Sequence, residues 1–398
     1  MFSNKNIKTA AIICEYNPFH NGHLLHIQKT RELTGADCII ALMSGQFVQR
    51  GEPAVFDKYI RTQMALSGGA DLVIELPTLY AVSSAERFAE GSIELLNALG
   101  NIDYLCFGSE NGSLKALETV AKILINEPES FKENLHRKLK DGVSFPAARS
   151  YALEFENADA SVLNSPNNIL GIEYLKALYK TNSSIVPFTI KRDDCGYNYD
   201  SLSDCSDYAS ALAIRKELSE TDNSLLPDSF KKYIPENILP LYSGKGVYLK
   251  DFDEVIFYSL LKNKETGYTG FLDVSEELSA KILKNLPQFR TTETFIDLLK
   301  SKNITRTSIS RTIIHILLDI TEEYGKLNPS YARILGFKKE VPVLHLLKNS
   351  SSIPLISKMA DAKIDKLLQL DINASLLYSY LNHSYSNEFA SSPIVYTS

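Results

Sequence analysis

The sequence has no long apolar run, and this excludes one broad class of protein. A membrane-spanning helix needs roughly 18 to 20 consecutive apolar residues, and no stretch of the 398 residues approaches that length. The N-terminal segment 1–8 is polar and has no apolar signal core before the first expected strand. We therefore expect a cytosolic protein with no membrane partner.

Cysteine is also scarce. The five cysteines are an odd number, and no pair has the close CxxC spacing of a zinc site. Cys14, Cys38 and Cys106 lie inside apolar runs, which favours buried structural thiols. Cys195 and Cys205 sit in a polar, Asp-rich stretch that could bind a metal adventitiously. We expect no structural metal.

The sequence has no excess of basic charge. Its formal net charge is −6, which does not indicate a nucleic-acid partner, so any such surface must be a local patch.

Apolar residues are abundant, at 44% of the sequence against 23% charged, which is enough to bury the cores of two or three domains. The composition therefore indicates a folded globular protein.

Short apolar runs alternate with helical patterns in the first part of the chain. Four runs lack polar alternation and predict strands buried on both faces. They are 9–14, 37–43, 71–76 and 104–107. Amphipathic segments between them predict the helices 22–33, 58–67 and 85–99. This alternation predicts a Rossmann-like α/β domain with a parallel, doubly wound sheet, whose ligands bind at the carboxyl ends of the strands.

The rest of the chain is expected to be mostly helical. One further strand is expected at 185–190, and a helix is expected to start near Ser210. Beyond Pro227 the pattern predicts helices separated by short polar turns, for example 253–261, 275–284 and 308–320. We place a boundary near Asn237, between an α/β domain, 1–237, and a mainly helical C-terminal domain, 238–398.

Two histidines follow the first expected strand. His20 and His23 flank Gly22 in the first turn of a helix, beside free backbone amides and the positive end of the helix dipole, where polyphosphate would be held. Gly22 permits close approach of a phosphate, and Pro18 fixes the preceding loop. The strand–loop–HxGH–helix order is similar to the signature of the nucleotidyltransferase superfamily. There, the histidines stabilise the transition state at the α-phosphate and the departing pyrophosphate.

A second segment, 208–216, resembles the ISSTxxR-type motif of that superfamily. In that motif a hydroxyl and a basic residue at a helix start hold the β and γ phosphates. Ser210, Arg215 and Lys216 keep this pattern of charge and hydroxyl. Leu212 stands where threonine is usual, which removes one hydroxyl contact. An ordinary surface helix is the alternative interpretation.

Polar residues at other expected strand ends are further candidates. The segment 108–110 follows a strand, and a simple turn explains it equally well on spacing alone. Asn167, Asn168 and Gly171 follow a proline and could be no more than the start of a helix. Arg192 comes after the strand 185–190, where it can reach a phosphate.

Together these segments resemble one family, the bacterial tRNA(Met) cytidine acetate ligases. The resemblance covers most of the chain, and its segments are EYNPFHNGH (15–23), MSGQFVQRGEPAVFDKYIRTQMAL (43–66), ADLVIELP (70–77), FGSEN (107–111), SPNNILGIEYL (165–175), ASALAIRK (209–216), SISRTIIHILL (308–318) and ARILGF (332–337). It implies a nucleotidyltransferase fold. The implied enzyme uses ATP to activate acetate as acetyl-adenylate, then acetylates the wobble cytidine of elongator tRNA(Met) to N4-acetylcytidine.

The resemblance also implies a site. Magnesium would accompany the ATP, and the less acidic C-terminal region would help hold the tRNA. His20 and His23 would be catalytic. The implied and motif-based ATP contacts are Ile13, Cys14, Glu15, Tyr16, Asn17, Phe19, His20, Gly22, His23, His26, Gly108, Asn167, Asn168, Arg192, Ser210 and Arg215.

The segment after the second strand has two interpretations. Gln46, Gln49 and Arg50 follow its carboxyl end, where acetate or the cytidine could lie, and an ordinary turn beside the active site is the alternative. Lys58 and Arg61 on the next helix are expected to be solvated charges, with contact to tRNA phosphates as the alternative.

Two other functions compete with the ligase. One is an adenylyltransferase that joins ATP to a phosphorylated metabolite, although roughly 160 residues beyond Asn237 would then lack a task. The other is a nucleotide- or RNA-binding scaffold without catalysis. Intact His20 and His23 argue against the scaffold, whereas Leu212 argues weakly for it. The sequence gives no oligomeric state.

Overall fold

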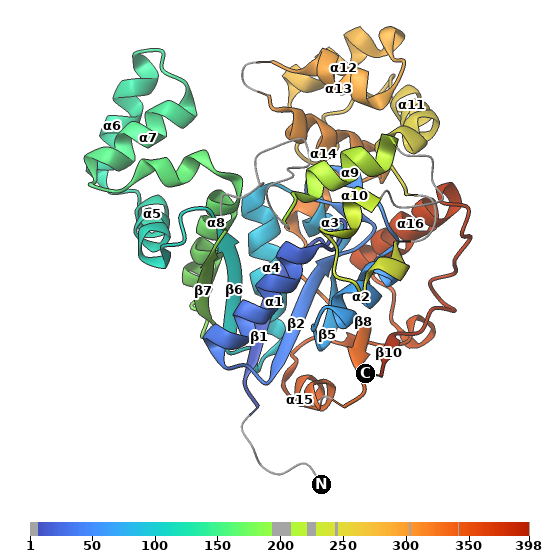
Figure 1. Ribbon diagram of the computed structural model, residues 1–398. Coiled ribbons are helices and arrows are strands. Elements are labelled where there is room, and N and C mark those ends of the chain that lie inside the picture. The colour runs from blue at the N-terminus through green and yellow to red at the C-terminus, as the bar shows by residue number, and fades with distance from the viewer. Residues whose placement is uncertain are drawn as a thin grey trace.

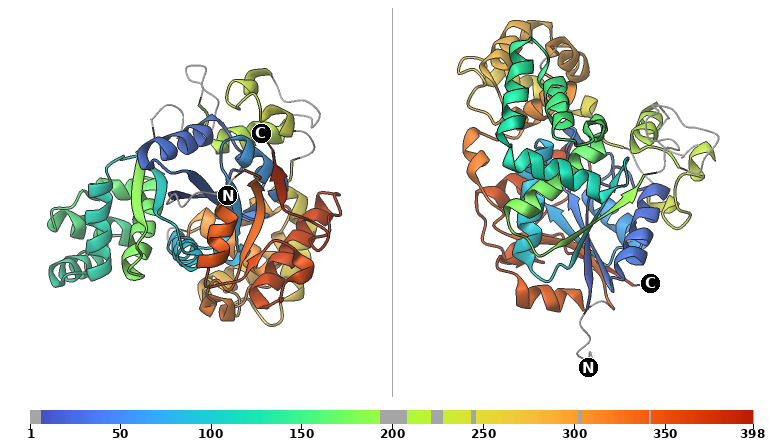
Figure 2. Two further views of the ribbon diagram at one scale, coloured as in Figure 1. Left: turned by 90° about the horizontal axis from the view of Figure 1, so that it is seen from below. Right: turned by 90° about the vertical axis from the view of Figure 1, so that its left-hand side faces the viewer.

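The fold is known from a computed structural model, which describes residues 7–192, 208–220, 228–242, 246–301, 304–340 and 342–397. Its centre is a sheet of order β10-β8-β5-β2-β1-β6-β7, with helices on both faces (Figures 1 and 2). The parallel strands are β1 (Thr9–Cys14), β2 (Cys38–Ser44), β5 (Leu72–Leu76), β6 (Tyr104–Ser109) and β7 (Val186–Lys191). The predicted Rossmann-like, doubly wound fold class is confirmed.

The sheet has a core on each face because its strands carry apolar residues on both sides. In β2, Ile39, Ala41 and Met43 pack with α1 and α2, whereas Ile40 and Leu42 pack with the helices of the opposite face. The first pair of helices is α1 (Asn21–Thr34) and α2 (Lys58–Ser67). The opposite face is covered by α3 (Thr78–Ala81), α4 (Ala85–Leu99) and α8 (Pro166–Lys180). A strand without polar alternation is thus explained by burial on two faces.

The order of the strands locates a crevice. From β1 the chain goes to β2 and β5 on one side, and then returns to pair β6 and β7 on the other side. The carboxyl ends of β1 and β6 therefore lie where the direction of winding reverses, the usual ligand position in open α/β sheets.

The C-terminal part contains strands that the sequence did not predict. The unpredicted strands are β8 (Ala332–Lys338), β9 (Leu355–Ile356) and β10 (Ile394–Tyr396). β8 pairs antiparallel with β5, and β9 and β10 pair parallel with β8. The expectation of helices alone beyond Pro227 is therefore wrong for these segments, because a short apolar run does not distinguish strand from helix. The boundary at 237 stays a prediction, and the hydrogen-bonded sheet continues across it.

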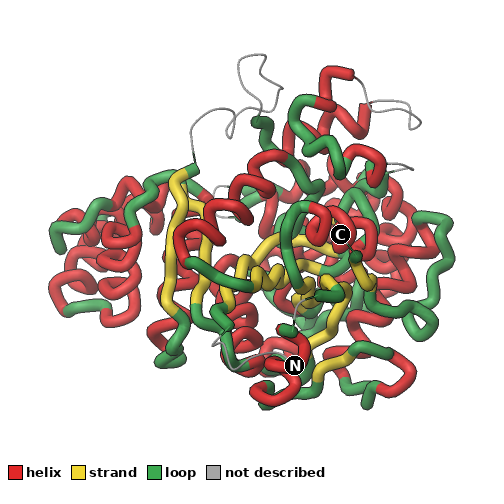
Figure 3. Tube along the Cα trace, turned by 60° about the horizontal axis from the view of Figure 1, so that its bottom comes forward, coloured by secondary structure: helices red, strands yellow, loops and turns green. Residues whose placement is uncertain are grey.

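Two groups of helices project beyond the sheet. The three expected C-terminal helices are confirmed within a few residues. One group is α5 (Leu114–Asn126), α6 (Glu129–Lys140) and α7 (Phe145–Phe155), and the other is α11 (Asp253–Lys262), α12 (Glu276–Asn285), α13 (Thr292–Leu299) and α14 (Arg306–Leu317). Figure 1 shows them on opposite sides of the end at which the parallel strands terminate, and Figure 3 shows the strands of the sheet lying among helices. The remaining strands and α-helices are β3 (Phe47–Val48), β4 (Glu52–Pro53), α9 (Ala211–Glu220), α10 (Asp228–Lys231), α15 (Val343–Ser350) and α16 (Lys366–Leu381).

The prediction for Lys58 and Arg61 is wrong. Both were expected to be solvated, but both side chains are fully buried. The Lys58 ammonium lies 2.8 Å from the Glu75 carboxylate. The Arg61 guanidinium donates to the carbonyls of Glu15, at 2.7 Å, and Ser44, at 2.9 Å. Residue type suggests an exposed charge, but these charges have buried partners, and their burial excludes contact with tRNA phosphates.

Among the described residues, no helix combines the length and the apolar character that spanning a bilayer requires.

Candidate active site

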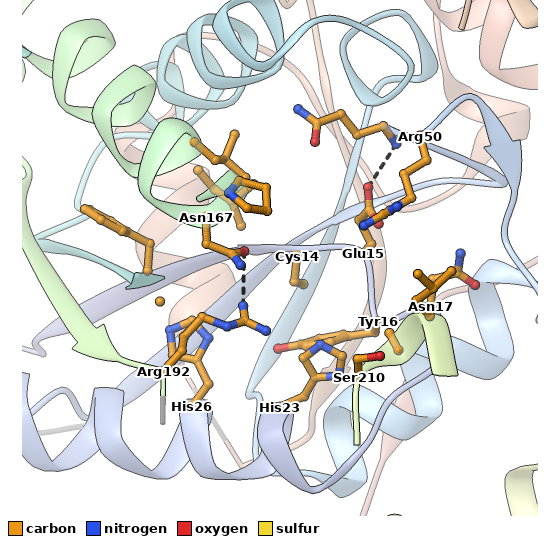
Figure 4. Close-up of a pocket in the computed structure, with 18 of the residues that line it drawn as sticks. Cys14, Glu15, Tyr16, Asn17, His23, His26, Arg50, Asn167, Arg192 and Ser210 are labelled. Carbon is orange, nitrogen blue, oxygen red and sulfur yellow. Dashed lines mark hydrogen bonds between the residues drawn. The ribbon is translucent and has the colours of Figure 1, made fainter. Parts of the chain in front are cut away.

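A cavity of about 300 Å³ lies at the carboxyl ends of β1 and β6 (Figure 4). It contains most of the residues that the sequence singled out. They are Ile13, Cys14, Glu15, Tyr16, Asn17, His20, His23, His26, Gly108, Asn167, Arg192, Ser210 and Arg215. Gln49, Arg50, Glu110 and Leu212 also line it. Segments far apart in the sequence thus meet at one place.

Three of the predicted contact residues lie elsewhere. Phe19 is fully buried in the core beneath α1. Asn168 is buried and accepts the backbone N–H of Asn111 through its side-chain oxygen, at 3.0 Å. Gly22 lines a small neighbouring cavity of about 60 Å³, which shares His23, His26 and other residues with the larger one. Phe19 and Asn168 therefore support the cavity wall from behind.

The paired histidines cap the N-terminus of α1. His20 is the N-cap residue, and its Nδ1 accepts the backbone N–H of Gly22 at 3.0 Å. The Nδ1 of His23 accepts the backbone N–H of His20 at 3.3 Å, and the two rings stack with centroids 3.8 Å apart. Since each Nδ1 is an acceptor, each neutral ring carries its proton on Nε2. Two Nε2–H donors are thereby held side by side in the lining of the cavity.

Burial keeps these rings neutral. Removal from water lowers the pKa of His20 to about 3 and that of His26 to about 4, and the positive charge of Arg192 adds to both effects. Burial, followed by the neighbouring His20, also lowers the pKa of His23 well below its ordinary value. At neutral pH the rings are therefore hydrogen-bond donors and not cations.

We expect His20 and His26 to show no titration between about pH 8 and pH 5 in histidine-selective NMR spectra of the free protein. Histidines of the unfolded chain take up protons below about pH 6.5. In the folded state these histidines stay neutral until the pH approaches their lowered pKa values. The free energy of unfolding is therefore highest above about pH 6.5 as far as these groups are concerned, and it falls as the pH is lowered. A titration midpoint near 6.5 for either ring would contradict the assigned environment.

Arg192 closes one side of the cavity. Its Nη1 donates to the side-chain oxygen of Asn167 at 3.1 Å, as Figure 4 shows. Asn167 in turn donates through Nδ2 to Glu110 at 2.6 Å, and the other Glu110 oxygen accepts the backbone N–H of Asn168 at 3.0 Å. Glu110 therefore caps α8 and fixes the amide that orients Arg192.

Arg215 provides a second guanidinium. Its side chain is largely buried, and Nη1 donates to the carbonyl of Asn17 at 2.8 Å. Ser210 accepts the backbone N–H of Ala213 at 3.0 Å and so begins α9. The carboxylate of Glu52 lies 4.0 Å from Arg215. Arg192 and Arg215, together with Arg50, therefore bring three cations to the cavity that the neutral histidines line, an arrangement suited to a polyanion.

The loops after β1 and β2 are joined at the cavity. The Glu15 carboxylate accepts the backbone N–H of Gln49 at 2.9 Å. Gln46 is buried and binds Asp57 through Nε2 at 2.7 Å, so it supports the start of α2 and does not line the cavity. Burial raises the pKa of the Cys14 thiol, so this cysteine stays protonated and unreactive.

Some lining residues were not predicted. They are Phe88, Phe107, Pro166, Leu170, Tyr174 and Ala211. Leu170 and Tyr174 are four residues apart on α8 and so share one face of the helix. Apolar residues of this kind look like any core residues in a sequence, so only the helical spacing of Leu170 and Tyr174 could have indicated part of this wall.

Gly171 sets how closely α8 approaches β6. A Cβ at this position would lie 2.6 Å from the ring of Phe107, closer than real contacts allow. We expect Gly171→Ala to lower the free energy of unfolding by about 1 to 3 kcal/mol, measured by urea denaturation. Gly270→Ala, where an added Cβ meets nothing within 4 Å, is the matched control. Equal effects of the two substitutions would argue against this packing constraint.

The described residues contain no cluster of three or more His, Cys, Asp or Glu side chains that could hold a metal ion. Cys195 and Cys205, with most of the Asp-rich stretch around them, lie outside the described residues.

Fold and site together define a nucleotidyltransferase-type α/β protein. Residues 7–392 match the family model described as HIGH Nucleotidyl Transferase. The tRNA(Met) cytidine acetate ligase of Clostridium perfringens is 42% identical over 97% of this chain and 98% of its own. That of Acetivibrio thermocellus is 40% identical over 94% of each chain. The chain belongs to this ligase family within the HIGH nucleotidyltransferases, and the resemblance seen in the sequence is confirmed.

Solved structures agree with this assignment. The crystal structure of apo Thermotoga maritima TmcAL superimposes with a TM-score of 0.88, at 31% identity, covering 98% of this chain and 100% of that one. A second crystal form of the same protein, bound with alpha-thio ATP, superimposes with a TM-score of 0.86.

Proposed function

We propose that this protein uses ATP to activate acetate and then acetylates the wobble cytidine of elongator tRNA(Met). The observation that carries the proposal is the convergence of His20, His23, Arg192 and Arg215 on one cavity at the N-terminus of α1. Four donors at a helix start suit a triphosphate. The names of the relatives supply the acceptor, and the ATP analogue in the related Thermotoga structure supports the nucleotide.

In the first step, an acetate oxygen attacks the α-phosphorus of ATP and the bond to pyrophosphate breaks. Negative charge increases on the phosphate oxygens in the transition state. The Nε2–H groups of His20 and His23 donate to that charge, and Arg192 and Arg215 hold the outer phosphates. Because these donors are fixed before the reaction, they do not have to reorganise during it.

In the second step, the N4 amine of cytidine attacks the acyl carbon of acetyl-adenylate, the bond from that carbon to the AMP oxygen breaks, and the nitrogen loses one proton to solvent as AMP leaves. The mixed anhydride is already activated, so correct placement of the amine supplies much of the acceleration. The described lining contains two carboxylates, Glu15 and Glu110, and both accept backbone N–H groups.

Magnesium would enter with the nucleotide. Mg²⁺ commonly keeps several waters and binds substrate phosphates together with one or two carboxylates. The two carboxylates of the cavity fit that modest requirement, and the ion would offset phosphate charge.

The remaining sequence-derived contacts fall into two groups under this proposal. The first group lines the cavities and contacts the nucleotide or its surroundings. Its members are Ile13, Cys14, Tyr16, Asn17, His26, Gly108, Asn167 and Ser210 in the large cavity and Gly22 in the small neighbouring one. Phe19 and Asn168 act through the residues they support. The helical C-terminal region helps hold the tRNA.

The direct test incubates the protein with ATP, acetate and elongator tRNA(Met), and then measures nucleoside masses. We expect one acetyl group on the wobble cytidine, dependent on both ATP and acetate. Pyrophosphate exchange into ATP should require acetate. Exchange that ignores acetate and responds to a phosphorylated metabolite would overturn the proposal in favour of a metabolite adenylyltransferase, and no exchange at all would favour a scaffold.

A further inference from the structure

A second cavity, of about 660 Å³, adjoins the first. Its walls come from the β3–β4 turn, from α9, from segment 247–250 and from the start of α14. Arg50, Leu212 and Arg215 line both cavities. A ligand in the second cavity can therefore reach a group in the first across these three side chains. Its volume lies within the range of small-ligand sites.

The second cavity is basic although the whole chain is acidic. Five of its lining residues are cationic, and they are Arg50, Arg215, Lys216, Lys250 and Arg306. Only two, Glu52 and Glu293, are acidic. Arg306 also pairs with Asp297 at 2.6 Å, which leaves four cations against two acids in the lining. Against a net charge of −6 for the chain, this is still a local excess of positive charge. Such a patch attracts phosphates without a basic protein overall.

An aromatic side chain lies among the cations. Tyr248 lines the cavity, and the Lys250 ammonium lies 5.5 Å from the centroid of its ring. Proteins that bind single-stranded nucleic acid combine basic grooves with aromatic rings on which bases stack. A site for a small anion such as acetate would need neither the ring nor this volume.

Leu212 lies between the two cavities. It stands where the superfamily motif usually has a threonine, and its side chain is 38% exposed. An apolar side chain cannot hold a phosphate, but it can contact the face of a base. The departure from the motif is therefore explained if a nucleobase, and not the triphosphate, occupies this position.

We propose that the second cavity receives the target cytidine as a nucleotide turned out of its RNA loop. Lys216, Lys250 and Arg306 contact the RNA backbone, and the base lies at the border formed by Arg50 and Leu212. Its N4 amine then faces the acyl carbon formed in the first cavity. Sequence-specific RNA recognition usually takes unstacked bases from loops. This inference rests on the proposed function.

The test compares charge reversals inside and outside the cavity. The test variants change two residues that line the cavity, singly and combined, and they are Lys250→Glu and Arg306→Glu. The controls change two exposed lysines on α11 and α12, and they are Lys262→Glu and Lys284→Glu. The substrate is elongator tRNA(Met), and kcat and KM for RNA are measured at several salt concentrations. Acetate-dependent pyrophosphate exchange of the same samples is the internal reference for folding and activation.

We expect the double variant to have a KM for tRNA about tenfold or more above that of the wild type, while its pyrophosphate exchange rate stays close to that of the wild type. Removing each phosphate contact should lower the salt dependence of binding by about one in the slope of log K against log salt. The controls should change neither. Leu212→Ala should also raise the KM for tRNA, but without changing the salt slope, because it contacts a base.

Two outcomes overturn the inference in different ways. If the wild type acetylates tRNA and the cavity variants behave like the controls, the RNA enters elsewhere and the proposed function survives. If the wild type shows no acetate-dependent exchange, the proposed function fails and this inference fails with it.

Discussion

Replacing His23 by alanine is expected to lower the rate of acetate-dependent pyrophosphate exchange by about 10²- to 10³-fold. The substitution removes one of two Nε2–H donors that are fixed beside the position of the α-phosphate. Affinity for tRNA should remain largely unchanged, because His23 lines the first cavity and the adjoining small one, not the basic cavity. The measurement is exchange under saturating acetate, together with tRNA binding by filter retention.

A second variant separates catalysis from folding. His23 also accepts the N–H of His20, so alanine weakens the start of α1. Asparagine offers a side-chain oxygen close to the position of Nδ1 but nothing at Nε2. His23→Asn should therefore keep the cap and still lose the exchange activity. Exposed His136→Ala is the control, and recovery of wild-type exchange in His23→Asn would show that His23 acts only as a cap.

The α/β part of the fold was predictable because its signals are local. β1 has the predicted bounds 9–14, and α2 and α4 have the predicted bounds 58–67 and 85–99. Runs buried on both faces and helical periodicity are both visible within a few residues. The parallel sheet follows from the alternation of the two, and the position of the site follows from the sheet.

The unpredicted features depend on residues far away in the chain. Strand β8 forms because its backbone pairs with β5, more than 250 residues earlier, and its own apolar run fits a helix as well. Lys58 is buried because Glu75 and Glu388 meet it. The sequence around Lys58 does not predict its contact with Glu388.

The site, like the fold, was predictable where its signals are local in the sequence. The strand–loop–HxGH–helix order resembles the superfamily signature, so His20 and His23 were singled out from that order, and their position at the start of α1 agrees with the predicted helix start. The apolar wall made by Phe107 and Tyr174 was missed, because its residues resemble an ordinary core. Which polar residues line the cavity and which support it, as Gln46 does, depends on side-chain direction, which a sequence does not show.

The second large effect concerns a buried cluster of charges that connects the N-terminal α/β part of the chain with its C-terminal part. Lys58 lies 2.8 Å from Glu75 and 3.1 Å from Glu388. Arg333 of β8 lies 3.4 Å from Glu75 and also pairs with Glu388. All four side chains are at most 3% exposed. Two cations therefore neutralise two anions between α2, β5, β8 and the segment near residue 388.

We expect Lys58→Met to lower the free energy of unfolding by about 3 to 5 kcal/mol, measured by urea denaturation. The methionine fills similar space, so the loss comes from the buried carboxylates left without their cation. The double variant Lys58→Met/Glu388→Gln should lose less than the sum of the two single variants, because it removes one charge of each sign.

An exposed pair of similar length provides the control. Lys29 lies 2.7 Å from Glu32, and both side chains are well exposed, so Lys29→Met should leave unfolding unchanged within error. Burial alone would raise the pKa of Glu388, but Lys58 and Arg333 lower it to about 2. The stability contributed by this carboxylate is thus present above its ordinary pKa and is lost as the pH falls toward 2. Equal effects of Lys58→Met and Lys29→Met would show that burial adds nothing to the ion pair.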